Sequence, residues 1–211
     1  MHSENPLYGR SIGILGDSIS TFAGFVPEES KCYYPSAAGT DVLRVEQTWW
    51  HLLMDRHCMK LIVNDSYSGA TVCTHNREDQ PVSASFVERV KRSFSGENPP
   101  DYIFLFGLTN DNWLDRTVGQ LQFADWTETD LRQALPAYCY VLDYLARHNP
   151  QAKIVTIINT GMKPEVDDGM IRAAEHYGAY VVELQSIQES NGHPTAQGMI
   201  QIADQIEAVV L

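Results

Sequence analysis

Four short segments of this 211-residue chain carry side chains that together can perform nucleophilic chemistry. Ser18 ends a Gly-Asp-Ser sequence after an apolar run, Asn110 lies in Thr-Asn-Asp, and His193 lies in Gly-His-Pro-Thr. A serine hydroxyl is a weak nucleophile that a histidine can activate as a general base. The Asn110 amide, and the backbone N–H of Gly69 in a Ser-Gly-Ala turn, can stabilise the oxyanion formed when a serine attacks an ester. These residue types predict an ester hydrolase.

Each of these residues also has an ordinary structural explanation. A serine after a strand commonly caps a helix, and Gly69 and Asn110 have the residue types of simple turns. His193 is one of seven histidines, and a single loop histidine more commonly lies on the surface. The functional prediction therefore depends on the four segments coming together in space.

Alternating strand and helix patterns place these segments in an α/β fold. Short apolar runs predict strands over 11–15, 60–63, 102–106, 153–158 and 180–183. Apolar residues at helical spacing predict helices over 48–57, 82–92, 129–147, 163–177 and 195–209. The pattern is typical of a doubly wound parallel sheet of about five strands, with helices on both faces. Strand-to-helix loops of such a sheet share one edge, so the four segments can converge there.

The four segments, in this order, resemble the sequence blocks of the SGNH-hydrolase (GDSL-like esterase/lipase) superfamily. The resemblance covers residues 16–198 and implies a single domain over 1–211 with a three-layer α/β/α, flavodoxin-like fold. It implies that Ser18 is the nucleophile and His193 the base. It also implies an oxyanion hole formed by the Ser18 N–H, the Gly69 N–H and the Asn110 side chain, without a metal or cofactor.

Two positions depart from the family pattern. Ser190 stands where the family usually has an aspartate, three residues before the histidine, to orient the imidazole. Glu189 is a candidate replacement acid, and a backbone carbonyl or the Ser190 hydroxyl are the alternatives. Leu108 stands where a glycine often precedes Thr-Asn-Asp, which is expected to alter the floor of the pocket.

The substrate is predicted less directly than the reaction. Aromatic residues border the expected site, and aromatic faces suit sugar rings or aryl groups; they are Tyr33, Tyr34, Trp49, Trp50 and Trp113. At least one of the two adjacent tryptophans is expected in the core. We expect Asp17, Thr109 and Trp113 to contact the substrate. The chain has no long apolar lid, which favours short-chain acyl esters, with acetyl esters of carbohydrates as the leading hypothesis.

Three alternatives remain open at this stage. The same site would suit a thioesterase or lysophospholipase, and the missing aspartate would suit a catalytically impaired binding protein of the same fold. A flavodoxin-like flavin binder is disfavoured because Asp17 puts a carboxylate where a phosphate would lie.

Composition limits the partners and the compartment. The net charge of −12 argues against nucleic acid and anionic membranes. No window approaches the ~18 apolar residues of a membrane span. The polar first ten residues lack the core of a signal peptide. A soluble protein is expected in a compartment that the sequence leaves open: the cytoplasm, or the periplasm or exterior if a signal peptide has been removed. The oligomeric state and a pairing of Cys32 with Cys73 stay open.

Overall fold

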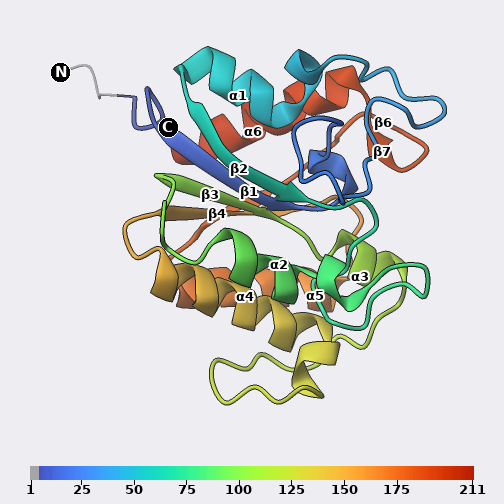
Figure 1. The fold of residues 1–211 in the computed structure, drawn as a ribbon, viewed down its shortest axis with the longest axis vertical. Coiled ribbons are helices and arrows are strands. Elements are labelled where there is room, and N and C mark those ends of the chain that lie inside the picture. The colour runs from blue at the N-terminus through green and yellow to red at the C-terminus, as the bar shows by residue number, and fades with distance from the viewer. Residues whose placement is uncertain (1–4) are drawn as a thin grey trace.

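The computed structural model describes residues 5–211 as a parallel five-stranded sheet with helices on both faces (Figure 1). The strand order is β2-β1-β3-β4-β5, which is the flavodoxin-like order. The strands are β1 (Ser11–Gly16), β2 (Lys60–Ser66), β3 (Tyr102–Phe106), β4 (Lys153–Ile158) and β5 (Tyr180–Glu183). The predicted α/β class and three-layer architecture are confirmed.

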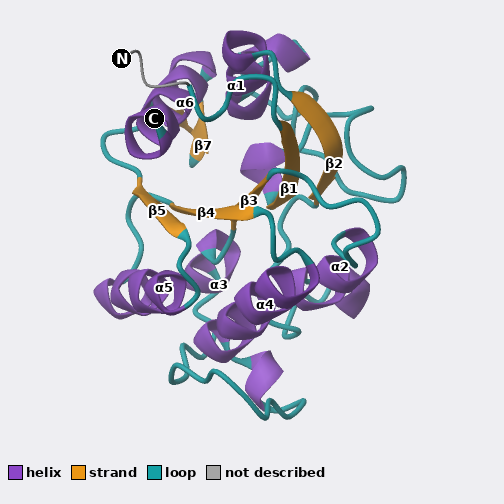
Figure 2. Cartoon of the chain, turned by 90° about the vertical axis from the view of Figure 1, so that its left-hand side faces the viewer, coloured by secondary structure: helices purple, strands orange, loops and turns teal. Residues whose placement is uncertain are grey.

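Helices pack on both faces of the sheet, a pair on one face and a larger layer on the other (Figure 2). The first pair is α1 (Trp49–His57) and α6 (Ala196–Val210). The opposite layer is α2 (Phe86–Ser93), α4 (Ala134–His148) and α5 (Pro164–His176). Each layer buries an apolar cluster, and burial of one large apolar side chain contributes about 1.5–3 kcal/mol. Within residues 5–211, no helix is both long enough and apolar enough to span a bilayer.

The predicted helices and strands agree with the structure, with two kinds of exception: the buried polar end of one strand, and helices or strands of only a few residues. β2 continues past residue 63 because its polar end finds partners: the Asn64 amide donates to the Ser20 carbonyl at 3.0 Å, and the Ser66 hydroxyl donates to Asn64. The predicted 82–92 and 129–147 helices each begin with a separate 3₁₀ turn. Periodicity gave no sign of the five-residue α3 (Thr109–Trp113) or of the hairpin of β6 (Glu189–Ser190) and β7 (His193–Pro194).

The four cysteines are free thiols in the structure. Cys139 is buried in α4, as its apolar surroundings predict. Cys58 lies in an apolar segment that predicts burial in the same way, and this prediction was wrong. Cys58 ends α1 in the left-handed region (φ 52°), where the chain turns outward and exposes the residue.

Candidate active site

The predicted segments meet at the carboxyl edge of the sheet, on the right of Figure 1. β1 lies between β2 and β3, and Gly16 aligns with Ser66 on one side and Phe106 on the other. The loops after these three strands therefore start at the same level. The β6–β7 hairpin lies at this end as well (Figure 1). This is the switch point of the sheet, where open α/β folds place their ligands.

Ser18 begins a single 3₁₀ turn, η1 (Ser18–Ser20), and the residue that caps this turn is Asp17, so Ser18 is not a helix cap. No apolar periodicity follows the turn, and the next helix of that layer starts only at Trp49. Two buried indoles support the turn: Trp50 Nε1 donates to the Ser20 carbonyl at 3.1 Å, and Trp49 Nε1 to the Ser20 hydroxyl at 3.3 Å. Both tryptophans are fully buried, so they support the site from beneath and do not line it.

Ser18 and His193 are in hydrogen-bond contact although 175 residues separate them. The Ser18 hydroxyl oxygen lies 2.9 Å from Nε2 of His193, and Nδ1 of the same ring lies 3.2 Å from the backbone carbonyl of Asn191. A carbonyl can only accept, so Nδ1 carries the proton and Nε2 is left to accept from the serine. This is the tautomer that a general base requires. Burial lowers the pKa of His193, and the Asn191 carbonyl offsets part of that effect.

A tight hairpin holds the histidine. Ser190 pairs with His193, and the two residues between them, Asn191 (φ 52°) and Gly192 (φ 73°), both have positive φ, as in a type I′ turn. Glu189, the candidate acid, is exposed, and its carboxylate accepts from the Thr160 hydroxyl at 3.4 Å. The structure therefore places the Asn191 carbonyl, and neither the Glu189 carboxylate nor the Ser190 hydroxyl, at Nδ1.

Gly69 lies at a turn that only glycine fits. The Ala70 N–H donates to the Tyr67 carbonyl at 3.2 Å and Gly69 has φ 83°, as in a type II turn. A Cβ at this position would lie 2.6 Å from Nε2 of Gln80. Among the described residues, none accepts a hydrogen bond from the Gly69 or Ser18 N–H. Both donors are therefore free for a ligand.

Asn110 is fixed against the same turn. Its amide donates one N–H to the Ala70 carbonyl at 3.0 Å, which leaves the second N–H for another acceptor. The neighbouring Asp111 is buried, and its carboxylate accepts from the Val72 N–H at 2.7 Å and the Cys73 N–H at 3.1 Å. Asp111 thus orders the loop beyond Gly69.

Two predicted substrate contacts are corrected by burial. Asp17 is completely buried and Thr109 is 1% exposed, so neither side chain reaches a ligand at the surface. Asp17 instead caps η1, accepting from the Ile19 N–H at 3.0 Å. Burial raises the pKa of the Asp17 carboxyl to about 7, and the Ile19 N–H and the Thr109 side chain offset part of the rise.

Leu108 does not form a pocket floor. Its side chain is 1% exposed and packs in the core with α2 and α4. The backbone has φ 67°, a left-handed conformation that glycine adopts readily and that costs other residues about 1–2 kcal/mol. A glycine often precedes Thr-Asn-Asp in the SGNH-hydrolase pattern, and this positive φ explains why glycine suits the position.

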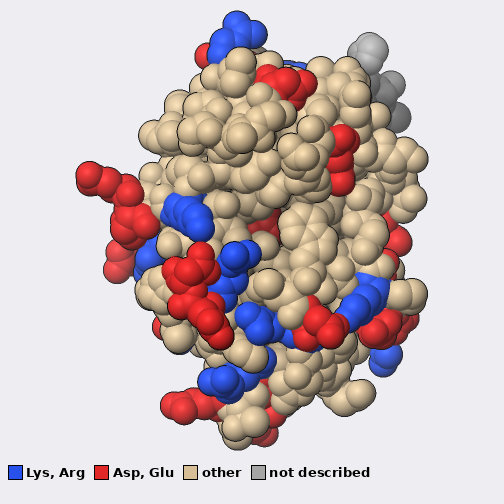
Figure 3. All heavy atoms as spheres, turned by 90° about the vertical axis from the view of Figure 1, so that its right-hand side faces the viewer, with Lys and Arg blue, Asp and Glu red and all other residues tan. Residues whose placement is uncertain are grey.

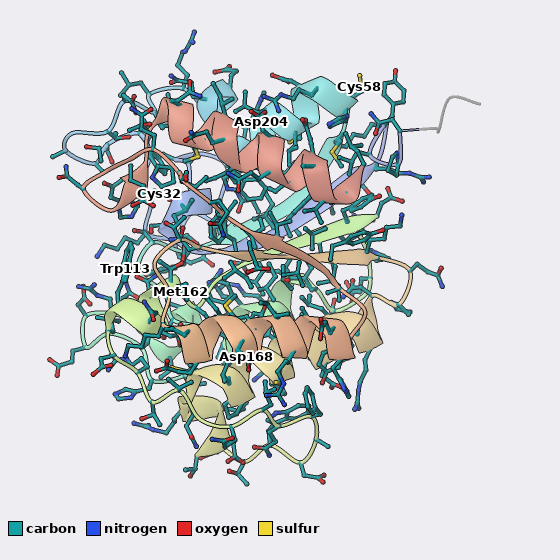
Figure 4. The ribbon with its side chains drawn as sticks, turned by 180° about the vertical axis from the view of Figure 1, so that it is seen from behind. Cys32, Cys58, Trp113, Met162, Asp168 and Asp204 are labelled. Atoms are coloured by element: carbon teal, nitrogen blue, oxygen red, sulfur yellow. The ribbon has the colours of Figure 1, made fainter. Side chains whose placement is uncertain are left out.

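Trp113 remains available to a ligand. It is 49% exposed, and its ring meets the imidazole of His193 edge-on at 6.0 Å. Figure 4 shows it at the end of the molecule where the strands finish.

The face at this end of the molecule is not uniformly acidic, although the chain as a whole is strongly negative. Figure 3 views it directly and shows acidic and basic side chains intermixed on its lower half.

Comparison with known proteins agrees with this geometry. A model of the GDSL-like lipase/acylhydrolase family matches residues 10–210. The chain belongs to this family. It is similar to two solved structures described as GDSL-like lipases. The one from Bacteroides ovatus shares 37% identity, with a TM-score of 0.89 over 95% of this chain and 97% of that one. The one from Bacteroides uniformis shares 38% identity, with a TM-score of 0.87 over 94% of this chain and 93% of that one. The predicted SGNH-hydrolase resemblance is confirmed.

Solved structures of lower identity share the fold only. An acetyl xylan esterase from Butyrivibrio proteoclasticus shares 16% identity, with a TM-score of 0.59 over 96% of this chain and 63% of that one. No curated protein matches the chain.

One functional residue of this GDSL-like hydrolase, Asn191, was not predicted from the sequence, although an Asn-Gly pair is a strong short-range signal for a hairpin.

Proposed function

We propose that this GDSL-like hydrolase is a serine esterase that removes short acyl groups, acetyl above all, from carbohydrates. The observation that carries the proposal is the 2.9 Å contact between the Ser18 hydroxyl and Nε2 of His193, in a ring whose Nδ1 faces a carbonyl. A nucleophile and a base within hydrogen-bond reach, with the base oriented by a third group, is the arrangement of acyl-transfer enzymes.

The reaction proceeds in two halves. Nε2 of His193 takes the Ser18 proton as the serine oxygen attacks the ester carbonyl, and a tetrahedral oxyanion forms. The C–O bond to the alcohol then breaks, and the imidazolium returns the proton to the departing alcohol. Water then gives a proton to the same nitrogen as its oxygen attacks the acyl-serine carbonyl. The bond between the acyl carbon and the serine oxygen breaks, and Nε2 returns the proton to that oxygen, which frees Ser18 and the carboxylic acid.

The oxyanion is assigned to three donors. They are the N–H groups of Ser18 and Gly69, which have no acceptor among the described residues, and the second N–H of the Asn110 amide, whose first N–H donates to the Ala70 carbonyl. Ser18 belongs to the η1 turn, Gly69 to the type II turn and Asn110 to α3, and donors fixed in this way need little rearrangement as negative charge develops. Loss of one such donor typically lowers kcat about 10²–10³-fold.

The surroundings of Ser18 favour a small acyl group. Ser18 is 4% exposed and Asn110 5% exposed, and the Gln80 side chain lies over Gly69. The reacting groups are therefore recessed from the surface, which favours a small acyl group. An acetyl group suits this arrangement better than a long fatty acyl chain.

The leaving alcohol is assigned to the Trp113 side. His193 must reach the departing oxygen, and the half-exposed Trp113 ring borders His193. An exposed indole beside the leaving group suits the apolar face of a sugar ring. The distant acetyl xylan esterase of this fold is consistent with that assignment.

An acyl-length and leaving-group series tests the proposal. Rates on p-nitrophenyl acetate, butyrate and octanoate are expected to fall steeply with chain length, and acetylated xylo-oligosaccharides are expected to release acetate. Trp113→Ala is expected to raise KM for the acetylated sugar more than for ethyl acetate. Octanoate or a fatty acyl thioester as the preferred substrate would instead favour a thioesterase or lysophospholipase.

A further inference from the structure

The ring of Tyr33 lies flat against the imidazole of His193. The ring centroids are 3.6 Å apart and the planes differ by 8°. We propose that Tyr33 is a positioning residue that holds the imidazole of His193 by stacking, in the absence of the orienting carboxylate. This inference rests on the proposed function, because it concerns the base of that reaction.

The loop that carries Tyr33 is bonded to both halves of the site. The Tyr33 N–H donates to the Thr21 hydroxyl at 2.9 Å, and that hydroxyl donates to the Ser18 carbonyl at 2.8 Å. The next residue, Tyr34, is fully buried, and its hydroxyl donates to the Pro194 carbonyl at 3.0 Å. The tyrosine pair therefore bridges the nucleophile segment and the histidine hairpin.

Stacking supplies a constraint that the hydrogen bonds of the ring do not. Hydrogen bonds at the two ring nitrogens, to Ser18 and Asn191, lie in the ring plane and leave the tilt of that plane weakly defined. The Tyr33 face fixes the tilt, and Trp113 meets the ring at 69° from another side. The negative face of an aromatic ring also favours the imidazolium over the neutral form, which matters because the Asn191 carbonyl is uncharged.

The same contact argues against Tyr33 as a sugar platform. One face of its ring is taken by His193, and the ring edge of Tyr34 packs against it with centroids 4.9 Å apart. Figure 4 shows Cys32, the residue before Tyr33, at the same end of the molecule as Trp113. Trp113 is thus left to face substrate, and Tyr33 faces the base.

Kinetics of Tyr33→Leu and Tyr33→Phe on p-nitrophenyl acetate test this role. Leucine fills similar volume without an aromatic face, and kcat is expected to fall about tenfold with KM within about twofold, because the lost stack acts on the base in the transition state. Phenylalanine is expected to restore kcat. Tyr8→Leu, an exposed tyrosine outside the site, is the matched control and should leave kcat unchanged.

A rise in KM with unchanged kcat in Tyr33→Leu would overturn the proposal and make Tyr33 a substrate contact. So would equal kcat values for the leucine and wild-type proteins. Thermal unfolding of each variant separates these results from a folding defect.

Proton NMR of the imidazole gives a readout that does not depend on turnover. The Cε1–H resonance of His193, assigned by its absence in His193→Gln, is expected upfield in the wild type and Tyr33→Phe through the ring current, and shifted back in Tyr33→Leu. An unmoved resonance would refute the stack. If the wild type hydrolyses no ester, the proposed function fails while this measurement still decides whether Tyr33 holds the ring.

Discussion

At the scale of single residues, His193 has a neutral partner at each ring nitrogen. Ser18 lies at Nε2 and the Asn191 carbonyl at Nδ1, and burial lowers the pKa of the imidazole below its ordinary value of 6.5. Only the neutral ring can act as base. We therefore expect kcat/KM to rise with pH through a pKa below 6.5 and to reach its plateau by neutral pH.

Placing a carboxylate beside His193 should shift the pH range over which kcat/KM rises. Ser190 pairs with His193 across the hairpin, so the side chains of the two residues are neighbours. In Ser190→Asp, the negative charge favours the imidazolium and raises the pKa of His193, and the acid limb of kcat/KM should shift to higher pH. The measurement is the pH–rate profile on p-nitrophenyl acetate. Ser190→Asn is the uncharged control, and an unmoved limb in the aspartate variant would contradict the placement of the hairpin.

Residue types predicted the reacting side chains better than the groups that orient and position them. Ser18, Asn110 and His193 have side chains that few other roles explain in combination, and the structure brings Ser18 and His193 together. The orienting group was left open because every residue has a backbone carbonyl, and only the hairpin geometry selects Asn191. Asp17 was expected to contact the substrate, and its complete burial depends on contacts distant along the chain.

At the scale of elements, α3 holds the loop that follows β2. Asp111 on α3 accepts from the N–H groups of Val72 and Cys73, and Asn110 on the same helix turn bonds the Ala70 carbonyl. The helix therefore sets where the Gly69 turn lies relative to β1. The oxyanion donors should be sensitive to this one carboxylate.

Asp111→Asn tests this dependence. Asparagine has one acceptor oxygen, so one buried N–H of the loop is left unpaired, which should lower the free energy of unfolding by about 1–3 kcal/mol. Misplacement of Gly69 should also lower kcat about tenfold or more. Urea unfolding and turnover of p-nitrophenyl acetate measure the two effects.

Asp115→Asn is the matched control for this change. Asp115 is exposed and its partner is Lys163, so loss of its charge should have little effect on the free energy of unfolding. Equal effects of the two substitutions would mean that the Asp111 bonds do not order the loop.

Long elements were predictable from periodicity and the short ones of the site were not. Three predicted strands, 102–106, 153–158 and 180–183, have the observed bounds, because buried apolar runs carry a strong pattern. β6 and β7 have two residues each, too few for a pattern to show. The 22–47 loop has no periodicity, yet it carries Tyr33; its order comes from tertiary contacts such as that of Tyr34 with Pro194.

At the scale of the whole molecule, charged groups are buried beneath the site. Arg89 is completely buried, donates to the Gly16 carbonyl at 3.0 Å, and lies 3.6 Å from the Asp65 carboxylate. Burial lowers the pKa of Arg89 to about 10 and raises that of Asp17 to about 7. Asp111 raises the pKa of Asp17 further, and Arg89 opposes that rise. The fold thus keeps a carboxyl at Asp17 that titrates near neutral pH.

Asp17→Asn should reveal this group in the pH dependence of stability. A carboxyl whose pKa rises from 3.8 to about 7 on folding stabilises the protein fully below pH 3.8 and loses that contribution as pH rises through 7. The asparagine variant cannot titrate and can still accept from the Ile19 N–H. Its free energy of unfolding relative to wild type should therefore increase between pH 4 and 7, by on the order of 3 kcal/mol.

Urea unfolding of both proteins at several pH values makes the comparison. Asp168→Asn, an exposed aspartate of α5 labelled in Figure 4, is the control and should show no such trend. A constant difference between Asp17→Asn and wild type across this range would show that Asp17 is ionised in the folded protein throughout.

The most direct test of the account is hydrolysis of p-nitrophenyl acetate by the wild type and by Ser18→Ala. The contact between Ser18 and His193 predicts a clear wild-type rate that falls roughly 10⁴-fold or more in the variant, because nucleophile and base act as a unit. His193→Ala should lose a similar factor. Equal rates for wild type and Ser18→Ala, or no rate in either across short-chain esters, would contradict the account and favour a binding protein built on this fold.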